Sequence, residues 1–494
     1  MDALLFLFEA YRLTLRVLVV VMSAQLVLGA IAYLRSKKSL VRPPLPAELP
    51  RVTVQLPVRN EFYTAARVID AVAALDYPRE LLEIQVLDDS DDQTVGIIVD
   101  AVARQRRAGF DIVQLRRFTP IDFKAGALAY GMTLAKGRFI AIFDADFLPP
   151  ADFLKRTIPY FEDEKVGMVQ ARWEHRNRNE SWFTRLQAQI LDGLMVVEQT
   201  AKSRSGLPLQ FNGTAGVWRR EAIERPGGWT FDSLTEDFDL SLRAQLMGYR
   251  LVHLPDLAVP SELPTTLGLF RVQQRRWALG TAQLLRKRLP LVLRAPLSVP
   301  ARLSLCLQLL RHFGYPLLVL LVLTVPLTTF DVVHPMIDYG IVNAWILGLA
   351  LLSVAAQQAL AEREIGRSAT QALFLSPLSL ALAIGLAPTY TVALVYGLID
   401  RAGAFHRTPK VPRVRRPGEP AYQATRSLLV WVEVAIGVAY VGFAALALGR
   451  GLVLESAFLG LIAFSYGWVG LGSMNVGVTQ AEGSAAGYTP ELPV

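Results

Sequence analysis

The 494-residue chain has one cysteine, Cys306, and only five histidines, which are scattered. One cysteine excludes a disulfide framework and a cysteine-rich zinc site, and no histidine cluster suggests another metal site. Charged residues make up 19% of the chain, below the fraction usual in soluble proteins, whereas hydrophobic residues make up 52% and the mean hydropathy is +0.33. This composition excludes a disordered chain and disfavours a purely soluble one.

The chain also lacks the glycine-rich patterns G-x-G-x-x-G and G-x-x-x-x-G-K-[ST], which disfavours a dinucleotide-binding fold and a P-loop. The formal net charge is +8. No basic stretch is interleaved with aromatic residues as in a nucleic-acid module, so we expect no nucleic-acid partner. In an apolar protein, the basic excess instead indicates cytoplasmic loops and anionic membrane lipid.

Long apolar runs near both ends of the chain predict membrane-spanning helices. The first covers residues 17–34, and the denser basic residues after it predict that its C-terminal end is cytoplasmic. Arginine-containing links flank residues 371–399 on both sides, so this run cannot be a single span; a hairpin, a re-entrant element, or a span with an interfacial helix stay open. The other runs are 313–330, 341–360, 427–448 and 452–469.

Between residues 51 and 147, short apolar runs alternate with helix-like segments at a spacing of about 30 residues, which is typical of βαβ units and a parallel sheet. Ligands of such sheets bind beyond the carboxyl ends of the strands. The predicted strands are 52–56, 83–87, 112–115 and 139–143, and the predicted helices are 65–75, 95–105 and 125–134.

Acidic pairs follow two of these strands. Asp144 and Asp146 stand at i and i+2, a spacing at which two carboxylates can share one hard cation that neutralises a diphosphate leaving group. Asp88 and Asp89 could contact ribose, base or metal. A D-x-D pair alone is more often a surface turn, but its place after a buried strand, matched by the second pair, favours a ligand site.

A third acidic cluster is Thr235, Glu236 and Asp237. A carboxylate here could accept the proton of an acceptor hydroxyl, as glycosyl transfer requires. The alternative interpretation is a helix start, with Thr235 as the N-cap and acidic residues in the first turn. Both can hold together, because a helix start positions a side chain rigidly.

Gln273, Arg276 and Trp277 lie on a predicted helix just before the second membrane block. Arginine can pair with phosphate oxygens as a two-pronged donor, and tryptophan offers a flat apolar face to a sugar ring. The alternative interpretation is a basic interfacial helix with a tryptophan anchor.

Together, these ordered motifs resemble the processive, membrane-embedded family 2 glycosyltransferases, which include cellulose synthases and hyaluronan synthases. Longer strings resemble the mannan-synthase and xyloglucan-backbone-synthase branches of the cellulose-synthase-like enzymes. These strings are QVLDDSDD (85–92), KAGAL (124–128), IFDADF (142–147), VQARW (169–173) and FNGTAGVWR (211–219). The resemblance extends from residue 51 to 290, and more loosely over the membrane block.

The resemblance implies an α/β GT-A fold, Rossmann-like with a mostly parallel sheet, as a cytosolic domain inserted in a multi-pass α-helical membrane domain. We expect an N-terminal transmembrane helix with a basic flank, a catalytic domain, interfacial helices with Q-x-x-R-W, transmembrane or interfacial helices, a gating-like loop, two transmembrane helices and a tail. Their predicted bounds are 1–42, 43–265, 266–311, 312–400, 401–426, 427–472 and 473–494, in that order.

The same resemblance implies roles for single residues. Asp146, together with Asp144, would bind Mg²⁺ or Mn²⁺. Asp237 would be the general base, with Glu236 and Thr235 beside it. Contacts to the nucleotide sugar would come from Asp88, Asp89, Lys124, Asp144, Gln273 and Arg276. Contacts to the acceptor would come from Trp277, Phe211, Asn212 and Gly213.

A further string, Phe405, Thr408 and Lys410, resembles the gating loop F-x-V-T-x-K of cellulose synthase, with Arg407 in place of the valine. Such a loop would fold over the nucleotide and exclude water during transfer. The alternative interpretation is a basic juxtamembrane loop.

We therefore expect an inverting enzyme that transfers hexose from UDP-glucose or GDP-mannose to a growing β-linked glucan, mannan or glucomannan, and that translocates the product. A non-processive transferase that makes a glycolipid on a lipid acceptor is the alternative, and a nucleotide-sensing transporter or receptor is disfavoured by the carboxylates. The Ala-, Leu- and Arg-rich composition suggests a bacterial inner membrane with a cytoplasmic catalytic domain, with a Golgi membrane as the alternative. The sequence leaves the oligomeric state open.

Overall fold

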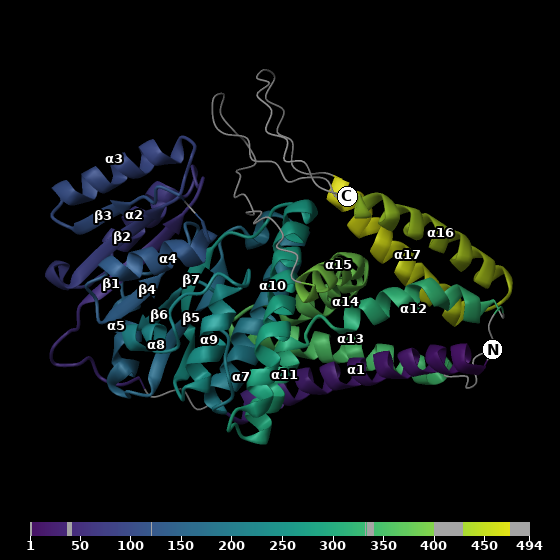
Figure 1. Cartoon of the computed structure of the whole chain (residues 1–494). Helices are drawn as coiled ribbons and strands as arrows, with labels where there is room; N and C mark the ends of the chain where they lie inside the picture. Colours follow the sequence, from purple (N-terminus) through teal and green to yellow (C-terminus); the bar gives the residue numbers. More distant parts are fainter. Residues whose placement is uncertain are drawn as a thin grey trace, which may run out of the picture.

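The computed structural model describes residues 2–36, 42–119, 121–330, 332, 340–399 and 428–474. A sheet domain forms one end of the molecule, and long helices form the other (Figure 1). The predicted gating-loop residues Phe405, Thr408 and Lys410 lie outside the described residues.

Seven strands form one sheet in the order β3-β2-β1-β4-β6-β5-β7. The first four strands pair in parallel, with Val54 of β1 opposite Ile84 of β2, and β5 pairs in parallel with β7. Strand β6 runs antiparallel to both β4 and β5, so the sheet is mostly parallel, as predicted. The strand bounds are β1 Val52–Val58, β2 Leu82–Asp88, β3 Asp111–Leu115, β4 Phe139–Ile142, β5 Val166–His175, β6 Gly216–Arg219 and β7 Arg250–Ser261.

The four predicted strands and three predicted helices are present, with ends that differ by a few residues. The sheet is buried on both faces because its strands carry apolar residues on both sides. In β4, Phe139 and Ala141 join the apolar cluster under α2, whereas Ile140 and Ile142 join the cluster under α4. The helices packed around the sheet are α2 Ala65–Ala73, α3 Thr94–Arg107, α4 Phe123–Leu134, α5 Phe153–Thr157, α6 Trp182–Asp192, α7 Gln199–Arg204, α8 Arg220–Glu224 and α9 Glu236–Leu246.

Among the described residues, four helices are long and apolar enough to cross a membrane, or up to six if each of two bent pairs is one span. Helices α14 and α15, which contain most of the run 371–399, form one of these pairs and are bent by 48°, so the pair is either a broken span or a re-entrant element, and the prediction that it is not a single span stays a prediction. Helices α11 and α12 form the other pair, bent by 52°. The helices of this part are α1 Asp2–Arg35, α10 Leu267–Arg294, α11 Val299–Leu309, α12 Gly314–Thr329, α13 Gly340–Glu364, α14 Ala369–Gly385, α15 Ala387–Leu398, α16 Leu429–Gly449 and α17 Val453–Met474.

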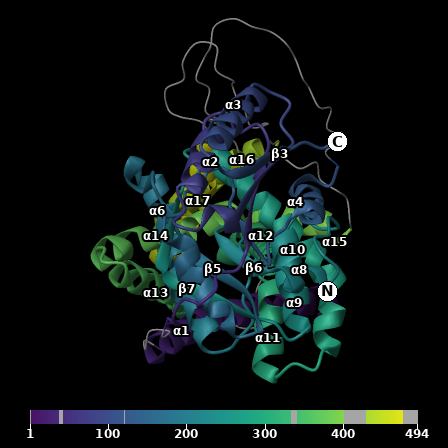
Figure 2. The same ribbon diagram turned by 90° about the vertical axis from the view of Figure 1, so that its left-hand side faces the viewer.

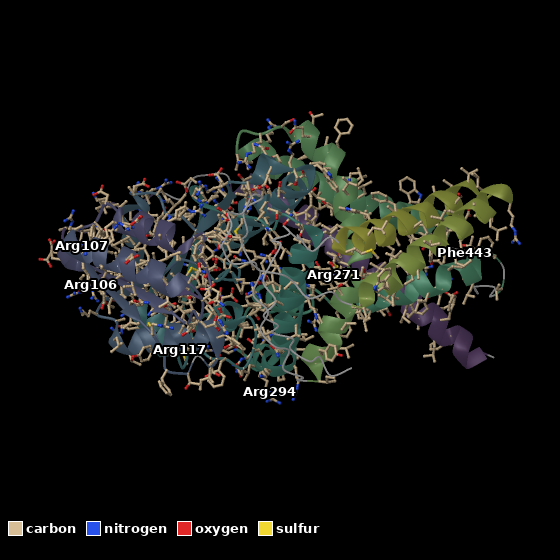
Figure 3. The ribbon with its side chains drawn as sticks, turned by 90° about the horizontal axis from the view of Figure 1, so that it is seen from above. Arg106, Arg107, Arg117, Arg271, Arg294 and Phe443 are labelled. Carbon is tan, nitrogen blue, oxygen red and sulfur yellow. The ribbon has the colours of Figure 1, made fainter. Side chains whose placement is uncertain are left out.

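Helix α10 lies between the sheet domain and the membrane helices (Figure 1). Seen from the sheet side, strands β5 and β7 lie between α13 and α14 on one side and α9 to α11 on the other (Figure 2). The buried Arg271 of α10, which is labelled in Figure 3, forms an ion pair with the buried Glu433 of α16. The hydroxyl of Tyr390 in α15 donates to Oε1 of Gln274 in α10 at 3.0 Å.

We expect Glu433→Ala to destabilise the folded protein by about 3–5 kcal/mol, because it leaves the Arg271 guanidinium buried without its partner. The double variant Arg271→Met, Glu433→Leu should recover most of that loss, because it removes both charges and fills the same volume. Thermal unfolding in detergent checks this, with Glu455→Ala, at an exposed position of α17, as the control. Equal unfolding temperatures for the Glu433 and Glu455 variants would contradict it.

Candidate active site

A cavity of about 210 Å³ lies beyond the carboxyl ends of β1, β2, β4 and β7. Its walls come from segments far apart in the chain: the turn after β4, the residues before β6, the start of α9, and α10. It brings together twelve of the predicted site residues: Asp89, Lys124, Asp144, Asp146, Asn212, Gly213, Thr235, Glu236, Asp237, Gln273, Arg276 and Trp277.

Asp88 and Asp89 occupy different positions although they are adjacent. The carboxylate of Asp88 is buried, and it accepts hydrogen bonds from the Ser90 backbone N–H at 2.9 Å and from Nε2 of Gln114 at 2.8 Å. Asp89 lines the cavity and accepts two hydrogen bonds from the Arg117 guanidinium, at 3.1 and 2.5 Å. Asp88 therefore holds the loop after β2, and only Asp89 faces the cavity.

Phe211 is fully buried and packs edge-on against Trp218, with ring centroids 5.5 Å apart. It lies behind the cavity, so in this geometry its side chain supports the segment rather than facing an acceptor. The two residues that follow do line the cavity. The amide of Asn212 is held by Nε2 of Gln199, which donates to Oδ1 at 2.9 Å.

Lys124, on α4, links three parts of the site. Its Nζ donates to Oδ1 of Asp144 at 2.5 Å and to the carbonyl oxygen of Gly213 at 2.8 Å. Burial alone would lower the pKa of Lys124, but the carboxylates of Asp144, Glu236 and Asp237 outweigh burial and raise it. The lysine therefore stays charged and balances the acidic residues around it.

Asp237 stands in the first turn of α9, where Oδ1 accepts a hydrogen bond from the backbone N–H of Phe238 at 2.7 Å. Burial, and then the neighbouring charge of Glu236, raise the pKa of Asp237 to about 7, whereas Lys124 opposes the rise. A carboxyl group with a pKa near neutral can take up a proton at physiological pH. Gly213, with φ of +84°, lies so close that an added Cβ would be 2.9 Å from Oδ2 of Asp237.

The structure bears on the helix-start interpretation of the third acidic cluster, whereas the role of Asp237 as a base stays a prediction. Helix α9 does begin at Glu236, so the predicted helix start is confirmed. Thr235 occupies the N-cap position, as predicted, but its hydroxyl makes no capping hydrogen bond. Thr235 also lines the cavity, beside Glu236. Burial raises the pKa of Glu236.

Helix α10 packs directly against the start of α9. A Cβ added to Gly280 would be 2.6 Å from Cγ2 of Thr235, so only glycine permits this approach. Oε1 of Gln283 accepts a hydrogen bond from the backbone N–H of Leu234 at 2.9 Å. Neither Gly280 nor Gln283 was among the predicted site residues, although their spacing from Arg276 places all three on one helix face.

Two carboxylates, Asp144 and Asp146, could hold a divalent cation in this cavity. Among the described residues, no group of three or more histidine, cysteine or acidic side chains could hold a metal ion. The pair is nevertheless a suitable donor set, because Mg²⁺ is commonly bound by one or two carboxylates plus substrate phosphate oxygens. Asp146 is largely buried, and its Oδ2 accepts a long hydrogen bond, 3.4 Å, from the backbone N–H of Glu262.

Comparison with known proteins shows what the chain resembles. Residues 139–332 match the family model described as "Glycosyl transferase family group 2". The chain is 42% identical over 250 residues to Glucomannan 4-beta-mannosyltransferase 1 of Oryza sativa subsp. japonica, a match that covers 50% of this chain and 48% of that protein. It is 43% identical over 247 residues to Glucomannan 4-beta-mannosyltransferase 2 of Arabidopsis thaliana, covering 49% and 46%. The chain thus spans about half the length of the curated relatives it matches.

The solved structure of mannosyltransferase PcManGT from Pyrobaculum calidifontis, in complex with GDP-Man and Mn2+, has the same fold. The TM-score is 0.50 at 22% sequence identity, over 78% of this chain and 100% of that one. The structure therefore has a GT-A-like sheet domain flanked by apolar helices, as the sequence predicts, and residues 139–332 are similar to family 2 glycosyltransferases.

We expect Gly280→Ala to lower the stability of the protein by about 1–3 kcal/mol, because the new methyl group clashes with Thr235. In an open helix position the same change is stabilising, because alanine loses less backbone freedom than glycine. Gly96→Ala in α3, where nothing lies within 4 Å of the added Cβ, is the matched control. Thermal unfolding should separate the two variants, and equal unfolding temperatures would show that α10 does not press on Thr235.

Proposed function

We propose that this chain is an inverting membrane glycosyltransferase that transfers a hexose from a nucleotide sugar to a growing β-linked polysaccharide. The observation that carries the proposal is the cavity in which the predicted base, the predicted metal-binding pair and the Q-x-x-R-W residues meet. The names of the rice and Arabidopsis relatives support a mannosyl donor and a glucomannan or mannan product, with UDP-glucose as the second candidate donor.

The proposed reaction is a direct displacement. Asp237 accepts the proton of the acceptor hydroxyl, which attacks C1 of the donor sugar from the side opposite the diphosphate. An attack from that side inverts an α-linked donor into a β-linked product. Arg276 and Lys124 pair with diphosphate oxygens, and Trp277 stacks against the acceptor sugar.

A divalent cation, Mg²⁺ or Mn²⁺, would be held by Asp144 and Asp146, and when bound it would neutralise the charge of the departing diphosphate. The Mn2+ complex of the Pyrobaculum protein supports this choice of ion. Asp89, with its charge balanced by Arg117, would lie near the nucleotide.

The apolar helices support an integral membrane protein, and the arginines after α13 and α15 support a cytoplasmic catalytic domain. The helices after residue 302 would form the path along which the product is translocated. The curated relatives are plant proteins, so they do not support the expected bacterial inner membrane.

The test is turnover by the purified full chain in nanodiscs. With Mn²⁺ or Mg²⁺ and labelled GDP-mannose, we expect a long product that a β-mannanase degrades, and the product from UDP-glucose should be weaker or absent. Chelation by EDTA should abolish turnover, and excess Mn²⁺ should restore it. A single-sugar product that partitions with lipid would show that the chain makes a glycolipid rather than a polymer. No turnover of either donor by folded protein would overturn the proposal.

We expect kcat/KM to fall about tenfold per pH unit below about 7, because Asp237 acts only when deprotonated and its pKa is about 7. In Glu236→Gln this acid limb should move to lower pH, because the charge of Glu236 raises the pKa of Asp237.

Asp237→Asn should lower kcat by about 10²–10⁴-fold and keep donor binding. The control is Asp100→Asn, at an exposed position of α3. Near-normal turnover in Asp237→Asn would refute its role as base.

A further inference from the structure

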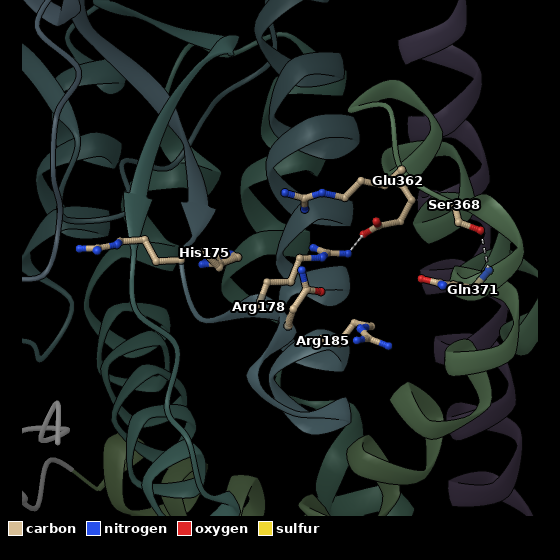
Figure 4. Close-up of a pocket in the computed structure, with 9 residues that line it drawn as sticks. His175, Arg178, Arg185, Glu362, Ser368 and Gln371 are labelled. Carbon is tan, nitrogen blue, oxygen red and sulfur yellow. Dashed lines mark hydrogen bonds and ion pairs between the residues drawn. The ribbon is translucent and has the colours of Figure 1, made fainter. Parts of the chain in front are cut away.

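A second cavity, of about 310 Å³, is not used by the proposed reaction. His175, at the end of β5, lines both cavities, so they lie on either side of this residue. One wall comes from the β5–α6 connection and α6, and the other from the end of α13 and the start of α14 (Figure 4). The lining residues are His175, Arg176, Arg178, Asn179, Arg185, Glu362, Arg367, Ser368 and Gln371.

The charged residues that line this cavity are four arginines and one glutamate, besides His175. Two of the arginines are neutralised by acidic residues of the surrounding structure. Arg178 is buried and donates to Asp192 and to Glu362, both at 2.5 Å. Arg367 donates to Glu174 at 3.0 Å and lies 3.4 Å from Asp192.

Arg185 differs from these two. It is half-buried on α6, and no carboxylate of the described ranges pairs with it. Figure 4 shows it beside Arg178, on the side of the cavity that faces Ser368 and Gln371. The cavity therefore has positive charge that the chain's described residues do not neutralise, next to an ion-pair network that holds its walls in place.

The opposite wall adds the start of a membrane helix. Ser368 caps α14, and its Oγ accepts a hydrogen bond from the backbone N–H of Gln371 at 3.3 Å. The partial positive charge of a helix N-terminus favours an anion at this place. This partial positive charge at the start of α14 adds to the positive charge of Arg185 on α6.

The cavity lies where the apolar helices end. Helix α13 ends at Glu364, whose carboxylate accepts a hydrogen bond from Tyr33 near the end of α1 at 2.9 Å. Trp182, the half-exposed first residue of α6, packs on Trp468 of α17 with ring centroids 5.4 Å apart. Tryptophan is enriched at the level of lipid headgroups, so the contact between Trp182 and Trp468 supports a position of the cavity at the membrane surface.

We propose that this cavity binds the phosphate group of an anionic lipid headgroup, with the guanidinium of Arg185 as its principal donor. Arginine matches phosphate oxygens with two parallel N–H donors, and basic pockets between membrane helices are suited to anionic headgroups. A soluble phosphate ester has the same chemistry, so the experiment must distinguish the two sources. The proposal does not depend on the proposed reaction, because its test measures retained lipid rather than turnover.

The test is native mass spectrometry of the full chain in detergent, titrated with phosphatidylglycerol or phosphatidylcholine. We expect the wild-type chain to retain phosphatidylglycerol in preference, and Arg185→Gln to weaken this binding about fivefold. Arg185→Lys should keep most of it, because the charge remains. The matched control is Arg107→Gln, an exposed arginine at the far end of the sheet domain from the membrane helices (Figure 3).

The outcomes are distinct. Displacement of the lipid from the wild-type chain by millimolar glycerol phosphate, but not by glycerol, supports a phosphate site that soluble esters can also enter. Equal retention of the two lipids, or equal loss in the Arg185→Gln and Arg107→Gln variants, overturns the proposal. If Arg185→Gln unfolds, Arg185→Met is measured in its place, and phosphatidylglycerol retention equal to that of the wild-type chain overturns the proposal.

Discussion

The contacts of the partly buried Lys124 ammonium group are the interactions on which the candidate active site depends. This group is shared by Asp144 after β4 and by the Gly213 carbonyl before β6, and its charge acts on Glu236 and Asp237 at the start of α9. Without this cation, the neighbouring carboxylates would repel one another. The charge of Lys124 therefore allows the turn after β4, the residues before β6 and the start of α9 to lie close together. The same charge keeps the pKa of Asp237 near neutral rather than higher.

Helix α10 connects the candidate active site to the membrane helices. Towards the membrane it is held by the ion pair of Arg271 with Glu433, and towards the site it presses through Gly280 on Thr235. The same helix carries Arg276 to the cavity wall. The position of the proposed base thus depends on packing between the sheet domain and the membrane helices. A sheet domain separated from its helices would lose one wall of the site.

Much of the fold and of the site could be predicted from local pattern. The parallel strands β1 to β4 are short apolar runs with helices between them, and the acidic pairs follow their carboxyl ends. The three later strands were not predicted, because Val166–His175 and Arg250–Ser261 carry polar residues at buried positions and Gly216–Arg219 has only two consecutive apolar residues. The antiparallel direction of β6 follows from long-range pairing, on which local pattern carries no information.

The sequence by itself indicated the candidate residues for glycosyl transfer, because carboxylates, a lysine and an arginine–tryptophan pair at ordered positions are the groups that this chemistry requires. It also determined which runs are apolar enough for a membrane. Only the tertiary structure decided that Asp89 faces the cavity while Asp88 is buried, and that Gly280 and Gln283 hold the start of α9. These facts depend on contacts between segments distant in the chain, and a pKa near 7 for Asp237 arises only when burial and neighbouring charges act together.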